Sequence, residues 1–392
     1  MRRTPPQRRL LRAAAAVLLL SLTGCPPPAP EQDRLQLAPA EFAALPGWRE
    51  DRLDDALAAL RRSCARLAAL APDAAVGPQA LGARAGDWRP ACTAADAPNA
   101  DARAVFEAHF VPFAAAGKDG AEGTYTGYYE PEIAVDAARS ERFATPILAR
   151  PPELVTVDLG QFREEWRNRT VSGHVVDGHL RPYHTRAQIV AGALAGRGLE
   201  LAWAGDPVDV FFLHIQGSGV LRFPDGRQQR VAFDGQNGYA YTAIGAELVR
   251  DGAMALADVS MQSIRAWLAA HPAEAPALMD RNRSYIFFKT VPDGPWGAAN
   301  VILTPERSLA VDTAFIAYGL PVFLDIDDPR SAGARLQRLM VAQDRGGAIR
   351  GPVRGDFFWG TGAAAGEAAG LMRSRGRSWL LLPRPLAERR AG

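Results

Sequence analysis

The chain has 392 residues, of which 48% are hydrophobic and 22% are charged, and its formal net charge is +2. This length is enough for two domains, each with its own core. No block of lysine or arginine occurs after the first twelve residues, so the sequence gives little support for nucleic-acid binding.

The first 24 residues have the features of a secretory signal peptide. Five arginines precede an apolar run over residues 13–22, which is shorter than the ~20 apolar residues that span a bilayer. The run ends in Leu22-Thr23-Gly24-Cys25, which resembles the lipobox of bacterial lipoproteins and implies cleavage before Cys25 and its lipidation. An ordinary signal peptide with a chance cysteine is the alternative. Cleavage would leave 40 basic and 43 acidic residues, a net charge of −3.

The region after the predicted signal begins with a proline-rich linker, which together with Cys25 covers residues 25–38. An apolar stripe with helical spacing then runs from Leu53 to Leu67 and includes Cys64. A second helical segment follows Asn99. Cys64 and Cys92 either pair in an oxidising compartment or remain buried thiols, and the sequence leaves both possibilities open.

From residue 123 the pattern changes to short β-prone runs broken by glycine and proline. Residues 208–216 alternate and predict a strand. Residues 220–223 and 231–233, joined by Asp225-Gly226, predict a hairpin.

Helices are predicted after Thr185, around residues 241–250 and after Ser260. The last hundred residues return to strands, at residues 285–288, 309–312, 322–326, 339–342 and 379–382. Many short strands without regular βα alternation favour β-rich barrels with added helices over a doubly wound sheet.

Two candidate sites for a metal or a cofactor are rejected. His174, His179 and His184 recur every five residues, a spacing that does not share a helix face, and they are interpreted as surface-loop residues. Gly360-Thr-Gly362 matches a dinucleotide fingerprint only loosely. We therefore expect no metal and no cofactor.

A serine and a histidine lie close together in His214-Ile-Gln216-Gly217-Ser218-Gly219. The segment lacks the nucleophile elbow, because Gln216 stands two positions before Ser218 where that motif has glycine. A serine hydrolase is therefore kept as an alternative only. Gln216 and Ser218 are also suited to hydrogen bonding with sugar hydroxyls.

Two aspartates near the end of the chain lie among glycines and aromatic residues. Asp344 is followed by Arg-Gly-Gly-Ala-Ile, and Asp356 by Phe-Phe-Trp-Gly. Glycine allows close approach to a ligand, and flat aromatic rings suit the apolar face of a sugar. Carboxylates in apolar surroundings have raised pKa values, as a general acid requires. A glycine-rich turn with surface aspartates is the simpler alternative.

Several motifs together resemble one family. In order, the chain contains Thr126-Gly-Tyr-Tyr, Gln216-Gly-Ser-Gly, Gly235-Gln-Asn-Gly-Tyr-Ala-Tyr, Ser260-Met-Gln-Ser-Ile-Arg, Phe287-Phe-Lys, and Asp344-x-Gly-Gly-Ala-Ile followed by Asp356. This order is similar to that of the membrane-bound lytic murein transglycosylase A family, and the resemblance covers roughly residues 120–385.

The resemblance implies a mainly β fold with helical additions, in which a double-psi β-barrel is formed by residues 39–130 and 290–392. The C-terminal part of the barrel corresponds to the family's three-aspartate domain. Residues 131–289 would form an inserted β-rich domain that binds glycan in a groove against the barrel.

The resemblance also implies an activity: non-hydrolytic cleavage of murein by a single carboxyl group that acts first as acid and then as base. By motif position, Asp356 matches the catalytic acid, Asp344 the neighbouring carboxylate that would raise its pKa, and Thr126 a hydrogen-bonding partner. Asp312 is expected to be structural. Tyr128, together with Gln216, Gly217 and Ser218, is expected to contact glycan.

Partners and location follow from the same resemblance. The expected partners are peptidoglycan strands, a membrane reached through the lipid anchor, and other cell-wall enzymes. Pro26 stands where inner-membrane lipoproteins of enteric bacteria carry aspartate, so the periplasmic face of the outer membrane is favoured. A serine-dependent peptidoglycan esterase or amidase, and a non-catalytic murein-binding lipoprotein, are the alternatives.

Overall fold

The computed structural model describes residues 33–166 and 169–391. The predicted signal peptide, Cys25 and the first part of the linker, up to residue 32, lie outside the described residues. Among the described residues, no helix combines the length and the apolar character that crossing a membrane requires.

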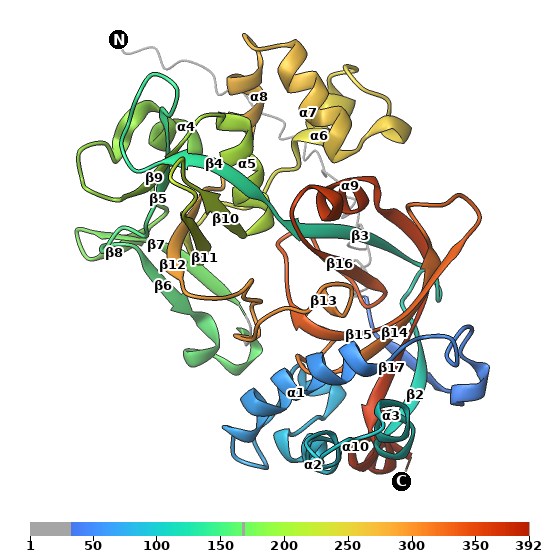
Figure 1. The fold of residues 1–392 in the computed structure, drawn as a ribbon. Coiled ribbons are helices and arrows are strands. Elements are labelled where there is room, and N and C mark those ends of the chain that lie inside the picture. Colours follow the sequence, from blue (N-terminus) through green and yellow to red (C-terminus); the bar gives the residue numbers. More distant parts are fainter. Residues whose placement is uncertain (1–32, 167–168, 392) are drawn as a thin grey trace, which may run out of the picture. The chain divides into compact units, whose positions relative to one another are not determined.

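The main sheet has eight strands, drawn from the two ends of the described chain (Figure 1). They are β1 (Gln36–Pro39), β2 (Phe110–Ala116), β3 (Gly123–Glu130), β13 (Ser308–Val311), β14 (Pro321–Asp327), β15 (Arg335–Asp344), β16 (Arg354–Thr361) and β17 (Arg373–Pro383). The order is β1-β2-β17-β14-β15-β13-β16-β3, and β17 also pairs with β3. This extra pairing closes β17, β14, β15, β13, β16 and β3 into a barrel.

Four barrel strands, β13, β14, β15 and β17, form where the sequence predicted strands, whereas β16 was not predicted. The first six residues of β14 are all buried, and all of them except Asp325 are apolar. In β17 exposed and buried residues alternate from Arg373 to Ser378, and the chain then becomes fully buried where the strand passes between β14 and β2. The mainly β fold class is confirmed.

Helices from the N-terminal part cover the barrel. They are α1 (Asp54–Ala68), α2 (Arg89–Ala95) and α3 (Ala102–His109), and α10 (Arg384–Ala391) ends the described chain beside them. The stripe predicted on α1 is buried, and α1 packs against β15. Cys64 on α1 and Cys92 on α2 form a disulfide, which resolves the choice that the sequence left open.

The middle of the chain forms a second, six-stranded sheet. Its order is β12 (Ile286–Val291), β11 (Gln228–Gln236), β10 (Ser218–Arg222), β4 (Glu132–Asp136), β9 (Glu200–Ala204) and β5 (Thr145–Leu148). The predicted hairpin is confirmed as the antiparallel pair β10–β11. A separate three-stranded sheet contains β6 (Val155–Asp158), β7 (Thr170–Val176) and β8 (His179–Arg181).

The other helices lie mostly in the middle of the chain. They are α4 (Arg186–Gln188), α5 (Pro207–Gln216), α6 (Ile244–Arg250), α7 (Met261–Ala270) and α8 (Ala275–Arg281), with α9 (Ala363–Leu371) between β16 and β17. The three helices predicted from sequence in this region are confirmed. Side chains from α5, α6, α7 and α8 share one hydrophobic cluster.

The strand predicted over residues 208–216 is wrong, because this segment is the helix α5. The Asp206 carboxylate accepts from the Val208 amide at 2.8 Å, and Pro207 occupies the first turn. Gly217 ends the helix in the left-handed conformation, with φ of 79°. Residues 210–214 are all buried, so the pattern of apolar residues in this segment does not distinguish a helix from a strand.

Two of the three histidines lie elsewhere than predicted. His174 is on β7 and His179 on β8, whereas His184 lies in a loop as expected. The His174 and Tyr183 rings pack edge to face with centroids 5.0 Å apart. In the described part of the chain, no group of three or more His, Cys, Asp or Glu side chains is arranged to hold a metal ion.

Candidate active site

Asp356 and Thr126 meet on neighbouring barrel strands. They are direct partners in the parallel register of β16 and β3, so their side chains share one face of the sheet. The Thr126 hydroxyl donates to Asp356 Oδ1 at 2.7 Å. The predicted hydrogen bond is therefore present, and Asp356 itself is only partly exposed.

Arg354 extends this contact, and sequence reasoning missed it. Its guanidinium donates to Thr126 Oγ1 at 2.7 Å. Because that oxygen already accepts from Arg354, its own hydrogen is left to point at Asp356. The signal was available, since Arg354 lies two residues before Asp356 and alternate residues of a strand share a face.

Burial raises the pKa of Asp356, while the Arg354 charge and the Thr126 hydrogen bond lower it, and burial outweighs both. The sequence predicted the Asp344 carboxylate as a cause of this rise. Burial is the largest cause of the rise, and the two carboxylates also interact, since the Asp356 charge raises the pKa of Asp344.

Asp344 is held tightly at the end of β15. Its Oδ1 accepts from the amides of Ala298 and Arg345, both at 2.8 Å, and its Oδ2 accepts from the Tyr128 hydroxyl at 3.0 Å. Burial is nevertheless the largest influence and raises the pKa of Asp344 to about 6. Both oxygens of this carboxylate are therefore acceptors for fixed donors.

Tyr128 supports Asp344 through its hydroxyl group, which donates to the Asp344 carboxylate. It pairs in register with Phe358, and the two rings lie 5.1 Å apart between centroids. The side chain is buried, so little of the ring remains for the glycan contact that the sequence predicted. Leu303, Ala310 and Ile349 complete the apolar cluster beneath the two aspartates.

Asp312, the third aspartate of the predicted set, lies just after β13. Its Oδ1 accepts from the Ala314 amide at 3.0 Å and its Oδ2 from the Gly351 amide at 2.9 Å. These bonds tie the loop after β13 to the loop that leads into β16. This geometry agrees with the structural role expected for Asp312.

The segment from Gln216 to Ser218 joins α5 to β10. Gln216 Oε1 accepts from the Tyr129 amide at 3.1 Å, which fixes this segment to the end of β3. Gly217 makes the turn, and Ser218 is buried. Within the described residues, no hydrogen bond joins the Ser218 hydroxyl to a histidine. His214 instead presents Nδ1 to Arg186 at 3.0 Å, so a serine–histidine pair is not formed.

Tyr241 brings a residue of the middle region to the two aspartates. A Cβ placed on Gly347 would lie 3.8 Å from the Tyr241 Cβ, so Tyr241 adjoins the loop after Asp344. Burial raises the pKa of Tyr241, and the Asp356 charge raises it further, which places the two groups within electrostatic reach. The sequence showed Tyr241 in a motif but did not single it out.

Two family models match the chain. The MltA specific insert domain matches residues 124–289, and the 3D domain matches residues 307–382. Membrane-bound lytic murein transglycosylase A of Escherichia coli K12 is 34% identical over 268 residues, which cover 67% of this chain and 66% of the relative. The match thus spans slightly less than two thirds of that relative.

Solved structures cover more of the chain. Membrane-bound lytic murein transglycosylase from Agrobacterium tumefaciens is 36% identical with a TM-score of 0.81, and the match covers 90% of this chain and 99% of that one. MltA of E. coli with bound chitohexaose is 28% identical with a TM-score of 0.64, and covers 89% and 91% respectively.

Proposed function

This chain belongs to the membrane-bound lytic murein transglycosylase A family, and we propose that it cleaves the β-1,4 bond between N-acetylmuramic acid and N-acetylglucosamine without water, leaving 1,6-anhydro ends. The observation that carries the proposal is the Arg354–Thr126–Asp356 hydrogen-bonded chain, which holds a carboxyl group of raised pKa with one oxygen uncommitted. The bound chitohexaose of the E. coli neighbour supports a glycan strand as the substrate.

In the first step, Asp356 is the general acid. Thr126 occupies Oδ1 as a donor, so the proton resides on Oδ2, for which the described residues offer no hydrogen-bond donor. That proton passes to the glycosidic oxygen, and the bond from this oxygen to the anomeric carbon breaks. A carboxyl group with a raised pKa is suited to this transfer near neutral pH.

In the second step, the same carboxylate is the base. The C6 hydroxyl of the muramic acid residue attacks its own anomeric carbon, and its proton returns to Asp356, so the enzyme regains its starting state. Glycosidases usually need a second carboxylate as nucleophile or water-activating base. Here the attacking oxygen belongs to the substrate, and such intramolecular attack is worth ~7–11 kcal/mol of the barrier.

The pKa of Asp344, about 6, would also suit a general acid, but the hydrogen bonds of its carboxylate argue against that role. Three fixed donors point at its two oxygens and favour the ionised carboxylate, so this group is held as an acceptor rather than as a proton donor. We assign Asp344 to positioning the loop that follows β15, with Tyr128 as its support. Asp312 remains structural.

We assign residues 39–130 and 290–392 to the catalytic barrel domain and residues 131–289 to an inserted glycan-binding domain. The strand membership of the two larger sheets supports this division. Gln216 and Gly217, which are partly exposed, are proposed to line the glycan groove on the inserted side, and the buried Ser218 to support this turn.

Membrane association follows from the family, whose members are named membrane-bound. We propose that lipidated Cys25 supplies the anchor at the periplasmic face of the outer membrane, where several acyl chains hold a protein firmly. Other cell-wall enzymes are proposed as further partners.

Digestion of purified sacculi tests the proposed activity. Mass spectrometry of the soluble fragments distinguishes the candidates, since anhydro ends indicate a transglycosylase and reducing ends a hydrolase. A serine-dependent esterase or amidase would leave the glycan intact and react with a fluorophosphonate probe. A non-catalytic murein-binding lipoprotein would retain sacculi without dissolving them.

A further inference from the structure

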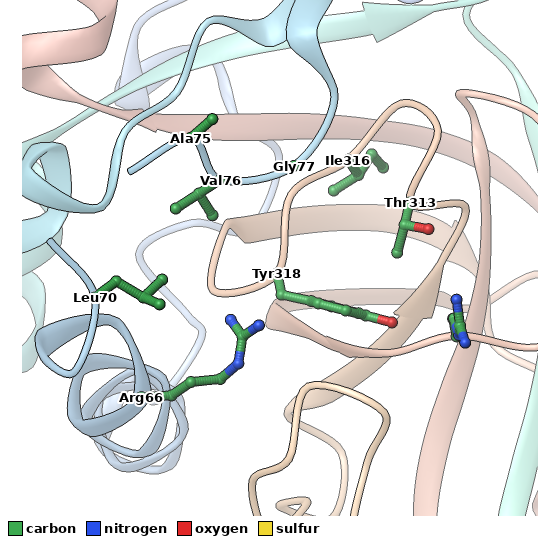
Figure 2. Close-up of a pocket in the computed structure, with 9 residues that line it drawn as sticks. Arg66, Leu70, Ala75, Val76, Gly77, Thr313, Ile316 and Tyr318 are labelled. Carbon is green, nitrogen blue, oxygen red and sulfur yellow. The ribbon is translucent and has the colours of Figure 1, made fainter. Parts of the chain in front are cut away.

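A pocket of about 220 Å³ opens at the end of β15, where Arg345 follows Asp344, and its lining includes neither Asp344 nor Asp356. Figure 2 shows residues that line it. Part of its lining comes from α1 and the segment that follows, part from the loop between β13 and β14, and part from the residue after Asp344. The lining residues are Arg66, Leu70, Ala75, Val76, Gly77, Thr313, Ile316, Tyr318 and Arg345.

Two guanidinium groups face this pocket. Arg66 lies over the Tyr318 ring, 5.7 Å from its centroid, and Figure 2 shows its head group directed toward that ring. Arg345 is exposed. In the described chain, neither guanidinium forms an ion pair or donates a hydrogen bond, although most half-buried arginines here, the class to which Arg66 belongs, do one or the other. Two such groups at one pocket favour an anionic ligand.

Tyr318 connects the pocket to the candidate active site. Its pKa is raised to about 12, chiefly by burial, while the Arg345 and Arg66 charges lower it and the Asp344 charge raises it. Tyr318 in turn acts on the pKa of Tyr128, which donates to Asp344. Arg345 lines the pocket and directly follows Asp344, whose Oδ1 accepts from the Arg345 amide at 2.8 Å, so the pocket adjoins the segment that holds Asp344.

The remaining lining residues are apolar or small, with Leu70 exposed at the rim. The volume is below the roughly 300–1,000 Å³ of pockets that enclose a whole small-molecule ligand. It suits an anionic branch of a larger ligand: a carboxylate against the arginines, with short apolar groups against Leu70, Val76 and Ile316.

We propose that this pocket binds a carboxylate carried by the murein strand. The inference rests on the proposed function, because a chain of N-acetylated sugars is itself uncharged and needs no arginine. The carboxylates of a murein strand belong to the peptide stems or, where a stem has been removed, to the lactyl group of muramic acid. Either source would place the carboxylate at the arginines while the sugar backbone lies at Asp356.

The test uses the full chain in detergent with the Arg66→Gln/Arg345→Gln double variant. Arg89→Gln is the control, because Arg89 is likewise an arginine on a helix of the N-terminal part but lies on α2 and does not line the pocket. All three proteins are compared for kcat/KM on soluble glycan strands with stems and on the same strands after amidase treatment. Calorimetry then measures binding of two probes, the free stem tetrapeptide and N-acetylmuramic acid.

We expect the double variant to lose about tenfold or more in binding of one probe, since hydrogen bonds to charged groups are among the stronger ones. Loss of tetrapeptide binding, with loss of the preference for stem-bearing strands, assigns the stem. Loss of N-acetylmuramic acid binding, with reduced turnover of the amidase-treated strands only, assigns the lactyl group. The control should match wild type in both measurements.

Equal binding of both probes by wild type and double variant would overturn the inference. That outcome is distinct from failure of the proposed function, in which the wild type would cleave neither kind of strand whatever the calorimetry showed. Matching thermal unfolding of the three proteins verifies that the substitutions leave the fold intact.

Discussion

Thr126 and Asp356 lie 230 residues apart in the sequence, yet they are direct partners across β3 and β16, and the Thr126 hydroxyl donates to Asp356 at 2.7 Å. The closed barrel creates this contact, because β3 comes from the N-terminal part of the chain and β16 from the C-terminal part. Neither segment holds the carboxyl group in place alone.

Replacing Thr126 by valine keeps the shape of the side chain and removes the donor. We expect kcat/KM on glycan strands to fall roughly 10- to 100-fold, because a hydrogen bond to a charged group contributes ~1.5–3 kcal/mol. Thr124→Val is the control: it lies on the same face of β3, but its hydroxyl accepts from Arg375 at 3.0 Å instead. Equal losses in the two variants would contradict the role given to Thr126.

Arg354→Gln should change the pH dependence of turnover. The Arg354 charge lowers the pKa of Asp356, so its removal raises that pKa further. Since the first step needs protonated Asp356, activity would persist to higher pH and the alkaline limb of the kcat/KM profile would move upward. Arg350→Gln, at an exposed arginine of the same segment, should leave the limb in place. A downward shift in Arg354→Gln would refute the assignment of Asp356 as the acid.

The titration of Asp344 makes the free energy of unfolding depend on pH. Its pKa is raised from 3.8 to about 6 in the folded protein, so between these values the folded state binds more protons than the unfolded state. The protonated form therefore contributes its full stabilisation below the pKa of the unfolded state, and this stabilisation is lost as the pH rises toward 6. The loss is of order 2–3 kcal/mol, at 1.36 kcal/mol per unit.

Asp344→Asn removes this titration. Denaturant unfolding at several pH values should show a smaller loss of stability across that window than in wild type. Asp312→Asn is the control, because it makes the same change at a buried aspartate that is not part of the Asp344–Asp356 pair. A loss of unchanged size in Asp344→Asn would mean that another group is responsible.

The Cys64–Cys92 disulfide should stabilise the N-terminal helices without contributing to catalysis. It closes a loop of 28 residues, for which chain entropy gives roughly 3–4 kcal/mol. Reductant should lower the free energy of unfolding of wild type by about this amount and leave that of a Cys64→Ala/Cys92→Ala variant unchanged. An equal response of the two proteins would show that reductant acts elsewhere.

Local patterns predicted much of this fold. The stripe on α1, the hairpin β10–β11 and the C-terminal strands other than β16 each follow from the spacing of apolar residues and from turn residues within one segment. The same reasoning failed for α5, where burial on all sides removed the difference between helical and strand spacing. There the start at Asp206-Pro207 and the stop at Gly217 were the better signals.

The site was predicted in part. Motif order located Asp356, Asp344 and Thr126, but Arg354 was missed although it precedes Asp356 by two residues on the same strand. Tyr128 was predicted to contact glycan, and its burial beneath Asp344 depends on the closed barrel. The Arg66–Arg345 pocket could not be foreseen, because its residues come from three distant segments that only the fold brings together.

The most direct test compares wild type with Asp356→Asn on purified sacculi, with mass spectrometry of the released fragments. The substitution keeps the size of the side chain and the acceptor for Thr126 but removes the transferable proton. We predict a folded variant that still binds sacculi, while only the wild type releases fragments with 1,6-anhydro ends. Release of the same fragments by Asp356→Asn at a comparable rate would contradict the proposal that this carboxyl group is the acid and the base.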